Sequence, residues 1–126
     1  MNVLLDTNVL IAHFTGDEDL RIKVRKSSIF FSVIVLAELQ YGAKTSRRIT
    51  ENLERLNELL QDAIPLPIDL ATASFFSDIK SSLRTKGRPI PDHDIWIAAT
   101  AFQHGLTLIS RDAHFREIDN LKVDKW

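Results

Sequence analysis

The chain of 126 residues contains no cysteine, which excludes disulfide bonds, zinc–thiolate sites and cysteine nucleophiles. It also lacks a long hydrophobic run: the stretch 29–39 is interrupted by Ser32 and Glu38, and roughly 20 apolar residues are needed to cross a bilayer. Residues 1–14 lack the basic start and the small-residue cleavage pattern of a signal peptide. We therefore expect a cytoplasmic protein without a membrane segment.

An excess of positive charge is also missing, although proteins that bind nucleic acid usually have one. Lysine and arginine number 16 against 17 acids, so the net charge is −1 and the pI is about 6.4. If four acids gather in one metal site, the remaining 13 acids face 16 bases and the rest of the molecule carries +3. Two divalent cations would likewise change the total from −1 to +3, so the low pI is only weak evidence against a nucleic-acid substrate.

The length and the 44% hydrophobic content suit one compact domain, which we predict to span residues 1–126. Short apolar runs predict buried strands, whereas a run bracketed by two prolines predicts a strand at the edge of the sheet. Strands are expected at residues 2–5, which should be buried, at 29–31, 106–109 and 121–123, and an edge strand at 64–68.

Helical patterns separate these strands, and capping residues predict where several helices begin and end. They are expected at residues 7–14 with Thr7 and Asn8 as caps, from residues 17–19 onward, at 33–41 between Ser32 and Gly42, at 46–62, at 70–86, and from Asp94 to Gly105. Strands that alternate with helices predict an α/β domain with a largely parallel sheet.

Four acids stand at positions where burial would be costly for a charged group. Asp6 and Asp112 follow predicted strands, where ligands gather in parallel sheets. Glu38 lies inside the apolar segment VIVLAEL, and Asp94 opens the most hydrophobic helix, DIWIAATAF. Clustered carboxylates repel one another, so their convergence is expected around a hard cation such as Mg²⁺ or Mn²⁺. Two such ions favour phosphodiester hydrolysis, which indicates a nuclease.

Each acid also has a purely structural explanation. Asp94 and Asp112 suit the N-cap of a helix, Asp6 could cap the first helix, and Glu38 could face solvent. The four together indicate a metal site more specifically than any one of them does.

Four segments resemble, in order and spacing, the successive motifs of VapC-type PIN domains. They are LLDTNVLI at residues 4–11, SVIVLAELQYG at 32–42, IPDHDIWIAATA at 90–101 and LTLISRDAHF at 106–115. The resemblance implies a sheet flanked by helices and a toxin endoribonuclease that leaves a 5′-phosphate. It also implies a homodimer and a cognate VapB-like antitoxin.

The same resemblance carries the family's acidic metal site to this chain residue by residue. It implies Asp6, Glu38, Asp94 and Asp112 as ligands of Mg²⁺ or Mn²⁺, with Asn8 and Ser110 as polar supports. The chain departs from the family pattern at Asp92, which competes with Asp94 as the third ligand. We predict that Asp94 is the ligand because it abuts the buried helix, whereas Asp92 follows Pro91 in an expected loop where it could act through water.

Other polar residues give weaker signals. None of the four histidines (His13, His93, His104 and His114) has a nucleophile or an orienting partner within a motif, and we interpret only His93 as a candidate substrate contact. Two groups of cations either contact RNA or form solvated helix faces: Lys44, Arg47 and Arg48, and Lys80, Arg84, Lys86 and Arg88.

Two alternative functions remain open at this point. A phosphohydrolase of the haloacid dehalogenase type also begins with an aspartate after a strand, but it needs a second aspartate where this chain has Asn8. A non-enzymatic α/β binding module would not require all four acids. The identity of the RNA, which could be structured or single-stranded and could be a tRNA, is not encoded in these patterns.

Overall fold

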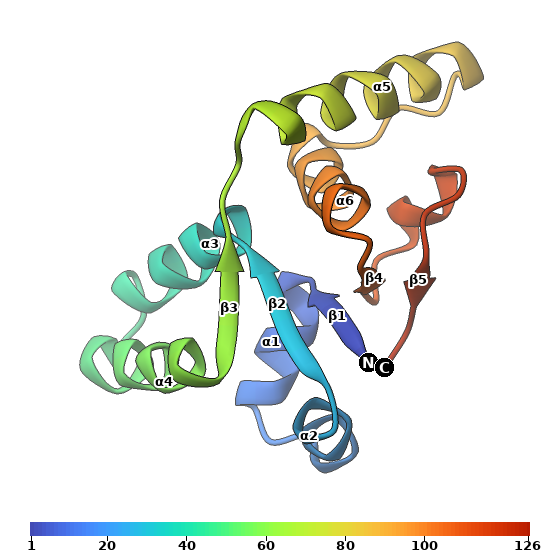
Figure 1. Cartoon of the computed structure of the whole chain (residues 1–126). Coiled ribbons are helices and arrows are strands. Elements are labelled where there is room, and N and C mark those ends of the chain that lie inside the picture. The colour runs from blue at the N-terminus through green and yellow to red at the C-terminus, as the bar shows by residue number, and fades with distance from the viewer.

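The computed structural model describes residues 1–126 and contains one five-stranded sheet in which every strand pair is parallel. The strands are β1 (Asn2–Leu5), β2 (Ser28–Ser32), β3 (Ala63–Leu66), β4 (Thr107–Ile109) and β5 (Val123–Asp124), and they lie side by side in the order β3-β2-β1-β4-β5 (Figure 1). β3, which contains Pro65, is an edge strand as predicted, because an edge tolerates the missing proline N–H.

Six α-helices and one short 3₁₀ helix connect these strands. They are α1 (Thr7–Phe14), α2 (Glu18–Arg25), α3 (Val33–Lys44), α4 (Ile49–Asp62), α5 (Leu70–Lys86), α6 (Asp92–His104) and η1 (Ala113–Glu117). The α3–α4 pair and the α5–α6 pair lie on opposite sides of the sheet in Figure 1. The predicted α/β fold, with a parallel sheet flanked by helices, is confirmed.

The strand order reverses between β1 and β4, and this reversal positions the acidic residues. The chain moves from β1 outward to β2 and β3, then returns through α5 and α6 to β4 on the other side of β1. Right-handed crossovers therefore place α1–α4 on one face and α5–α6 on the other. Loops diverge at such a reversal, which leaves a crevice at the carboxyl ends of the two central strands.

The core is centred on β1 and on α6. Val3, Leu4 and Leu5 of β1 have no solvent exposure, and α6 is buried on nearly every face from Ile95 to Ala101. Burial of one valine, leucine or isoleucine side chain stabilises the folded state by about 1.5–3 kcal/mol. The position of α6 is therefore fixed by packing on several sides. No helix of the chain has both the length and the apolar character needed to cross a membrane.

Several predicted helix ends differ from the structure. Asp6, rather than Thr7 or Asn8, is the N-cap of α1 and accepts the Thr7 N–H at 2.8 Å. Gly42 does not stop α3, which continues to Lys44, because a helical glycine costs only about 1 kcal/mol and keeps its N–H donor.

The α3–α4 connection and the start of α6 also differ from the prediction. α4 begins at Ile49 rather than at Ser46, because the Ser46 hydroxyl closes the α3–α4 turn by donating to Ala43 O at 2.6 Å and accepting from Asn52 at 2.8 Å. α6 begins at Asp92 rather than at Asp94, because Pro91 occupies the N-cap position.

Other predicted ends are confirmed. Ser32 caps α3 by accepting the Ile34 N–H, and Gly87 and Gly105 end α5 and α6 in the left-handed conformation. Asp69, at the N-cap of α5, forms a capping box with Thr72 and accepts a hydrogen bond from Gln103 of α6 at 2.8 Å. This contact joins the start of α5 to the end of α6.

Candidate active site

The pairing of β1 with β4 brings the first acid and its support together. The Asp6 N–H donates to Ile109 O at 3.0 Å, so Asp6 and Ser110 leave neighbouring strands side by side. The Ser110 hydroxyl donates to Asp6 Oδ2 at 2.7 Å and accepts the Asp112 N–H at 3.0 Å. Ser110 therefore connects two of the predicted acids, and both it and Asp6 are buried.

Asp6 is the most constrained carboxylate of the group, with 5% of its surface exposed. Its two oxygens accept hydrogen bonds from the Thr7 N–H, the Ser110 hydroxyl and, at 3.4 Å, the side-chain amide of Asn8. Burial raises the pKa of Asp6, the two shorter hydrogen bonds oppose that effect, and the charges of Asp94 and Asp112 raise the pKa further. The structure thus places both predicted supports, Asn8 and Ser110, on Asp6.

Asp94 and Asp112 both approach the same ring nitrogen of His114, Nδ1. Asp94 lies in the first turn of α6, is 8% exposed, and contacts His114 Nδ1 through Oδ2 at 2.8 Å. Asp112 caps η1 by accepting the His114 N–H at 2.9 Å, and its Oδ1 also lies 3.2 Å from His114 Nδ1. The N-cap explanation therefore applies to Asp112, but Asp94 caps no helix.

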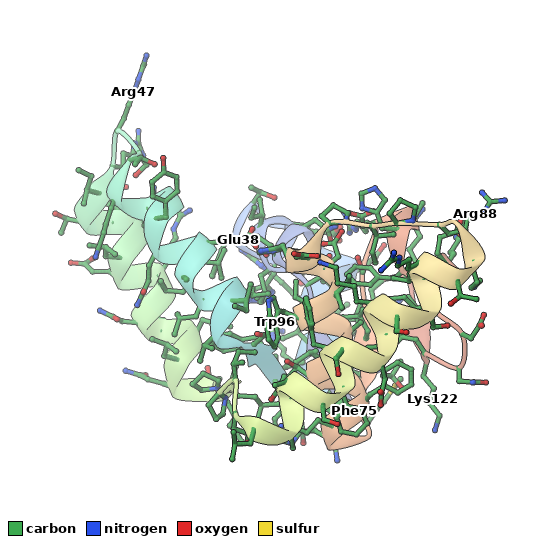
Figure 2. All side chains as sticks on the ribbon, turned by 90° about the horizontal axis from the view of Figure 1, so that it is seen from above. Glu38, Arg47, Phe75, Arg88, Trp96 and Lys122 are labelled. Carbon is green, nitrogen blue, oxygen red and sulfur yellow. The ribbon has the colours of Figure 1, made fainter.

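Glu38 approaches the cluster from α3, and Figure 2 shows it from above, where α3 meets the rest of the molecule. Its Oε1 is buried without a hydrogen-bond partner and lies against Nε2 of His93. Burial raises the pKa of Glu38, His93 and Thr7 lower it, and Asp6 and Asp94 raise it. Glu38 is thus close enough to these two acids to experience their charges.

Asp92 lies outside this group. It is the first residue of α6, so the loop predicted at this position was wrong. Its side chain is 59% exposed and pairs with Lys80 at 2.9 Å. Asp94, two residues further along the helix, faces the acids, because residues two apart on a helix do not share a face.

Two histidines also belong to this cluster, although the sequence did not predict contacts between them and the acids. His114 contacts Asp94 and Asp112, and its hydrogen bond to Asp94 together with the charge of Asp112 raises the pKa of His114. His93, considered only as a substrate contact, lies against Glu38. The one available signal was their position one and two residues from an acid in DHD and DAH.

These side chains fit a divalent cation. One carboxylate oxygen each from Asp94 and Asp112 and one ring nitrogen of His114 lie within 4.8 Å of one another. The buried Oε1 of Glu38, which lies against His93 Nε2, provides a further oxygen donor. Carboxylate oxygens are the donors that Mg²⁺ and Mn²⁺ accept, and a cation would offset the repulsion that raises the pKa of Asp6 and Glu38.

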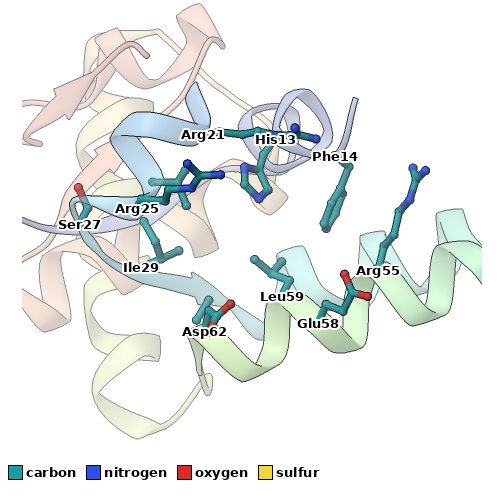
Figure 3. Close-up of a pocket in the computed structure, with 12 residues that line it drawn as sticks. His13, Phe14, Arg21, Arg25, Ser27, Ile29, Arg55, Glu58, Leu59 and Asp62 are labelled. Carbon is teal, nitrogen blue, oxygen red and sulfur yellow. The ribbon is translucent and has the colours of Figure 1, made fainter. Parts of the chain in front are cut away.

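A cavity separate from these acids lies at the amino ends of β2 and β3. It has a volume of about 610 Å³ and is formed by α1, α2, α4 and the starts of β2 and β3 (Figure 3). Three arginines line it (Arg21, Arg25 and Arg55), and burial and the charges of Arg21 and Arg25 lower the pKa of His13. None of the four acids lines this cavity; Glu38 lines a separate cavity of about 400 Å³ between α1, α3 and α4.

A family profile described as PIN domain matches residues 3–121. The chain belongs to the PIN-domain family. Ribonuclease VapC2 of Rickettsia felis is 28% identical over 132 residues, covering 100% of this chain and 98% of that protein. Toxin FitB of Neisseria gonorrhoeae is 33% identical over 121 residues, covering 87% of each chain.

Solved structures of PIN-domain proteins agree with this assignment. The structure described as VapBC2 from Rickettsia felis bound to a DNA fragment from their promoter has a TM-score of 0.88 at 27% identity, over 100% of this chain and 99% of that chain. The predicted resemblance to VapC-type PIN-domain ribonucleases of toxin–antitoxin systems is confirmed. The family match also decides against the phosphohydrolase and binding-module alternatives.

The buried charge of Asp6 leads to a prediction about the metal-free PIN domain. Because its pKa is raised, ionised Asp6 destabilises the folded state fully above that pKa. This destabilisation disappears as the pH falls through the raised pKa towards the ordinary value of 3.8. We expect metal-free Asp6→Asn to melt at a higher temperature than wild type at pH 7.5, and the difference to shrink as the pH is lowered towards 4.

Thermal melts followed by circular dichroism in the presence of chelator measure this difference. Asp92→Asn is the matched control, because it removes an exposed aspartate from the same helix turn as Asp94. A lower melting temperature for Asp6→Asn than for wild type at pH 7.5 would contradict the role of repulsion and burial.

Proposed function

We propose that this PIN-domain protein is a metal-dependent endoribonuclease that acts as the toxin of a toxin–antitoxin pair and hydrolyses phosphodiester bonds in RNA. The observation that carries this proposal is the convergence of Asp6, Glu38, Asp94 and Asp112 at the reversal point of the sheet. Relatives of this chain are named ribonucleases or toxins.

In this proposal the four acids hold Mg²⁺ or Mn²⁺, and Asn8 and Ser110 support them. Bound divalent cations would supply a more acidic water and positive charge for the leaving oxygen. Ser110 holds Asp6 at 2.7 Å and the backbone of Asp112 at 3.0 Å, so one hydroxyl fixes the spacing between two ligands. Asn8 accepts the Arg111 N–H at 3.3 Å and joins α1 to the loop after β4.

Electrostatics explain why such a site would require metal. Four ionised carboxylates repel the negatively charged phosphodiester, and no arginine or lysine contacts the four acids. His93 and His114 are the only basic side chains in contact with them. Cations would reverse the sign of the local charge and make approach of the RNA backbone favourable.

The proposed RNA class follows from the relatives and from the surface. A relative from Salmonella typhimurium, 27% identical over 130 residues, is named a tRNA(fMet)-specific endonuclease, which supports a tRNA as one candidate substrate. Of the cations next to α6, Lys80, Lys86 and Arg88 pair with acids, whereas Arg84 forms no ion pair. Arg84 is therefore the member of this group best placed to contact a phosphate.

The partner proposals have two sources. The solved complexes of VapC-type relatives contain VapB antitoxins or, for FitB, FitA, and this supports a VapB-like antitoxin for this chain. A homodimer is supported by α3, where Val33, Ile34 and Leu36 are only half-buried and Tyr41 is 71% exposed.

Cleavage should depend on added metal. Protein treated with EDTA and then freed of chelator is expected to leave an internally labelled RNA uncut, because carboxylates alone offer no electrophile to the leaving oxygen. Mg²⁺ or Mn²⁺ should restore cleavage, whereas Ca²⁺ should bind without supporting turnover because its coordination is looser. Undiminished cleavage by metal-stripped protein in chelator would end this mechanism.

The two aspartates of the DHD segment should differ sharply. Asp94→Asn is expected to reduce the cleavage rate by about 100-fold or more, because it removes a buried ligand. Asp92→Asn should stay within about three-fold of wild type, since an exposed ion pair with Lys80 contributes little. Initial cleavage rates on one labelled RNA measure the effect of each substitution, and circular dichroism checks that each variant is folded. A larger loss of activity in Asp92→Asn than in Asp94→Asn would assign the metal ligand to Asp92.

Assembly is tested independently of activity. We expect light scattering at micromolar concentration to give twice the monomer mass, because the half-buried apolar residues of α3 would then be covered. Tyr41→Glu, which places a charge on this helix, should shift the mass towards the monomer. A wild-type protein that is monomeric at this concentration would remove the homodimer from the proposal.

A further inference from the structure

His114 occupies a position between two acids that the proposed metal site uses. Its Nδ1 lies 2.8 Å from Asp94 Oδ2 and 3.2 Å from Asp112 Oδ1. The three donor atoms come from two parts of the fold, since Asp94 lies on α6, whereas Asp112 caps η1 and His114 is the second residue of η1. An exposed histidine ring is free to turn towards solvent, yet this ring faces inward.

The local backbone explains this orientation. The His114 N–H donates to Asp112 Oδ1 at 2.9 Å, so the capping turn holds the ring and the carboxylate on the same side of the loop. Asp94 faces them from a helix whose position is fixed by burial. Two of the three donors are thus placed by a capping interaction and the third by the core.

The distances suit joint coordination of one ion. Nitrogen and oxygen ligands lie about 2.0–2.2 Å from a first-row divalent cation, so two ligands of one ion are at most about 4.4 Å apart. The distances from His114 Nδ1 to the two carboxylates, 2.8 and 3.2 Å, are within this limit, and all three donors lie within 4.8 Å of one another.

We propose that His114 is a direct ligand of the ion held by Asp94 and Asp112, and that it makes the site prefer transition-metal cations such as Mn²⁺ to Mg²⁺. This inference rests on the proposed metal-dependent function and adds the metal preference to it. Mg²⁺ favours an all-oxygen shell, whereas imidazole nitrogen is a common ligand of transition metals. A histidine in the ligand set therefore discriminates between ions that four carboxylates alone bind similarly.

The opposite role is a specific alternative. His114 could instead act as an internal counter-cation that occupies the ion's place and leaves when the ion binds. A ligand and a competitor have opposite effects on metal affinity, because removing a ligand weakens binding and removing a competitor strengthens it. The sign of the change caused by His114→Ala therefore separates the two.

Isothermal titration of metal-stripped protein with Mn²⁺ and, separately, with Mg²⁺ measures this sign. We expect His114→Ala to weaken Mn²⁺ binding by about 10-fold or more and Mg²⁺ binding by less than about three-fold. His104→Ala, at the far end of α6 and exposed, is the matched control and should change neither. Unchanged or stronger Mn²⁺ binding by His114→Ala would overturn the proposal.

Pulsed electron paramagnetic resonance of the Mn²⁺-loaded protein provides a readout that does not depend on activity. Coupling of the ion to a ring nitrogen should be present in wild type and in His93→Ala, and absent in His114→Ala. Nitrogen coupling that persists in His114→Ala would contradict the assignment.

The same titrations distinguish this failure from failure of the proposed function. If Asp94→Asn abolishes Mn²⁺ binding while His114→Ala leaves it intact, the acidic metal site stands and only the histidine ligand is wrong. If neither Mn²⁺ nor Mg²⁺ binds wild-type protein, the metal-dependent function fails as well.

Discussion

The pairing of β1 with β4 is the interaction on which the site depends. One hydrogen bond, from the Asp6 N–H to Ile109 O, extends the ladder past the end of β1 and brings Asp6 beside Ser110, residues that are 104 positions apart in the chain. Because the strand order reverses at this pair, no crossover covers the carboxyl ends of the two strands. The crevice, the buried acid and its serine support all follow from this pairing.

The cost of gathering acids at this point shapes their surroundings. Asp6 is stabilised by three hydrogen-bond donors, yet burial still raises its pKa. Glu38 lies against the ring of His93, and Asp94 lies against the ring of His114, on the two flanks of the cluster. Unlike Asp6 and Asp112, Glu38 and Asp94 accept no backbone N–H, and a histidine ring is the close partner of each.

The sequence allowed the fold and the acids to be predicted because both depend on local pattern. Strand ends locate Asp6 and Asp112, and an acid at the start of an apolar helix identifies Asp94. The contact of His114 with Asp94 could not be predicted, because it joins two elements across 20 residues and leaves no periodic signal. The predicted helix ends were wrong where a side chain in the adjoining turn sets the boundary, as the Ser46 hydroxyl does through its hydrogen bonds between α3 and α4.

Core packing and site electrostatics are coupled through α6. The Phe76 ring of α5 stacks on Trp96, and Gln103 joins the end of α6 to the capping box of α5, so both ends of the helix are held while its middle is buried. Asp94 therefore cannot relieve its repulsion from Asp6 by a shift of the backbone, because such a shift would open the core. The remaining ways to relieve that repulsion are a protonated carboxyl, a nearby histidine or a bound cation. A protonated carboxyl attracts no phosphodiester and a histidine carries at most one positive charge, whereas divalent cations supply enough charge to reverse the sign of the cluster, so the rigidity that holds Asp94 in place favours the cation for catalysis.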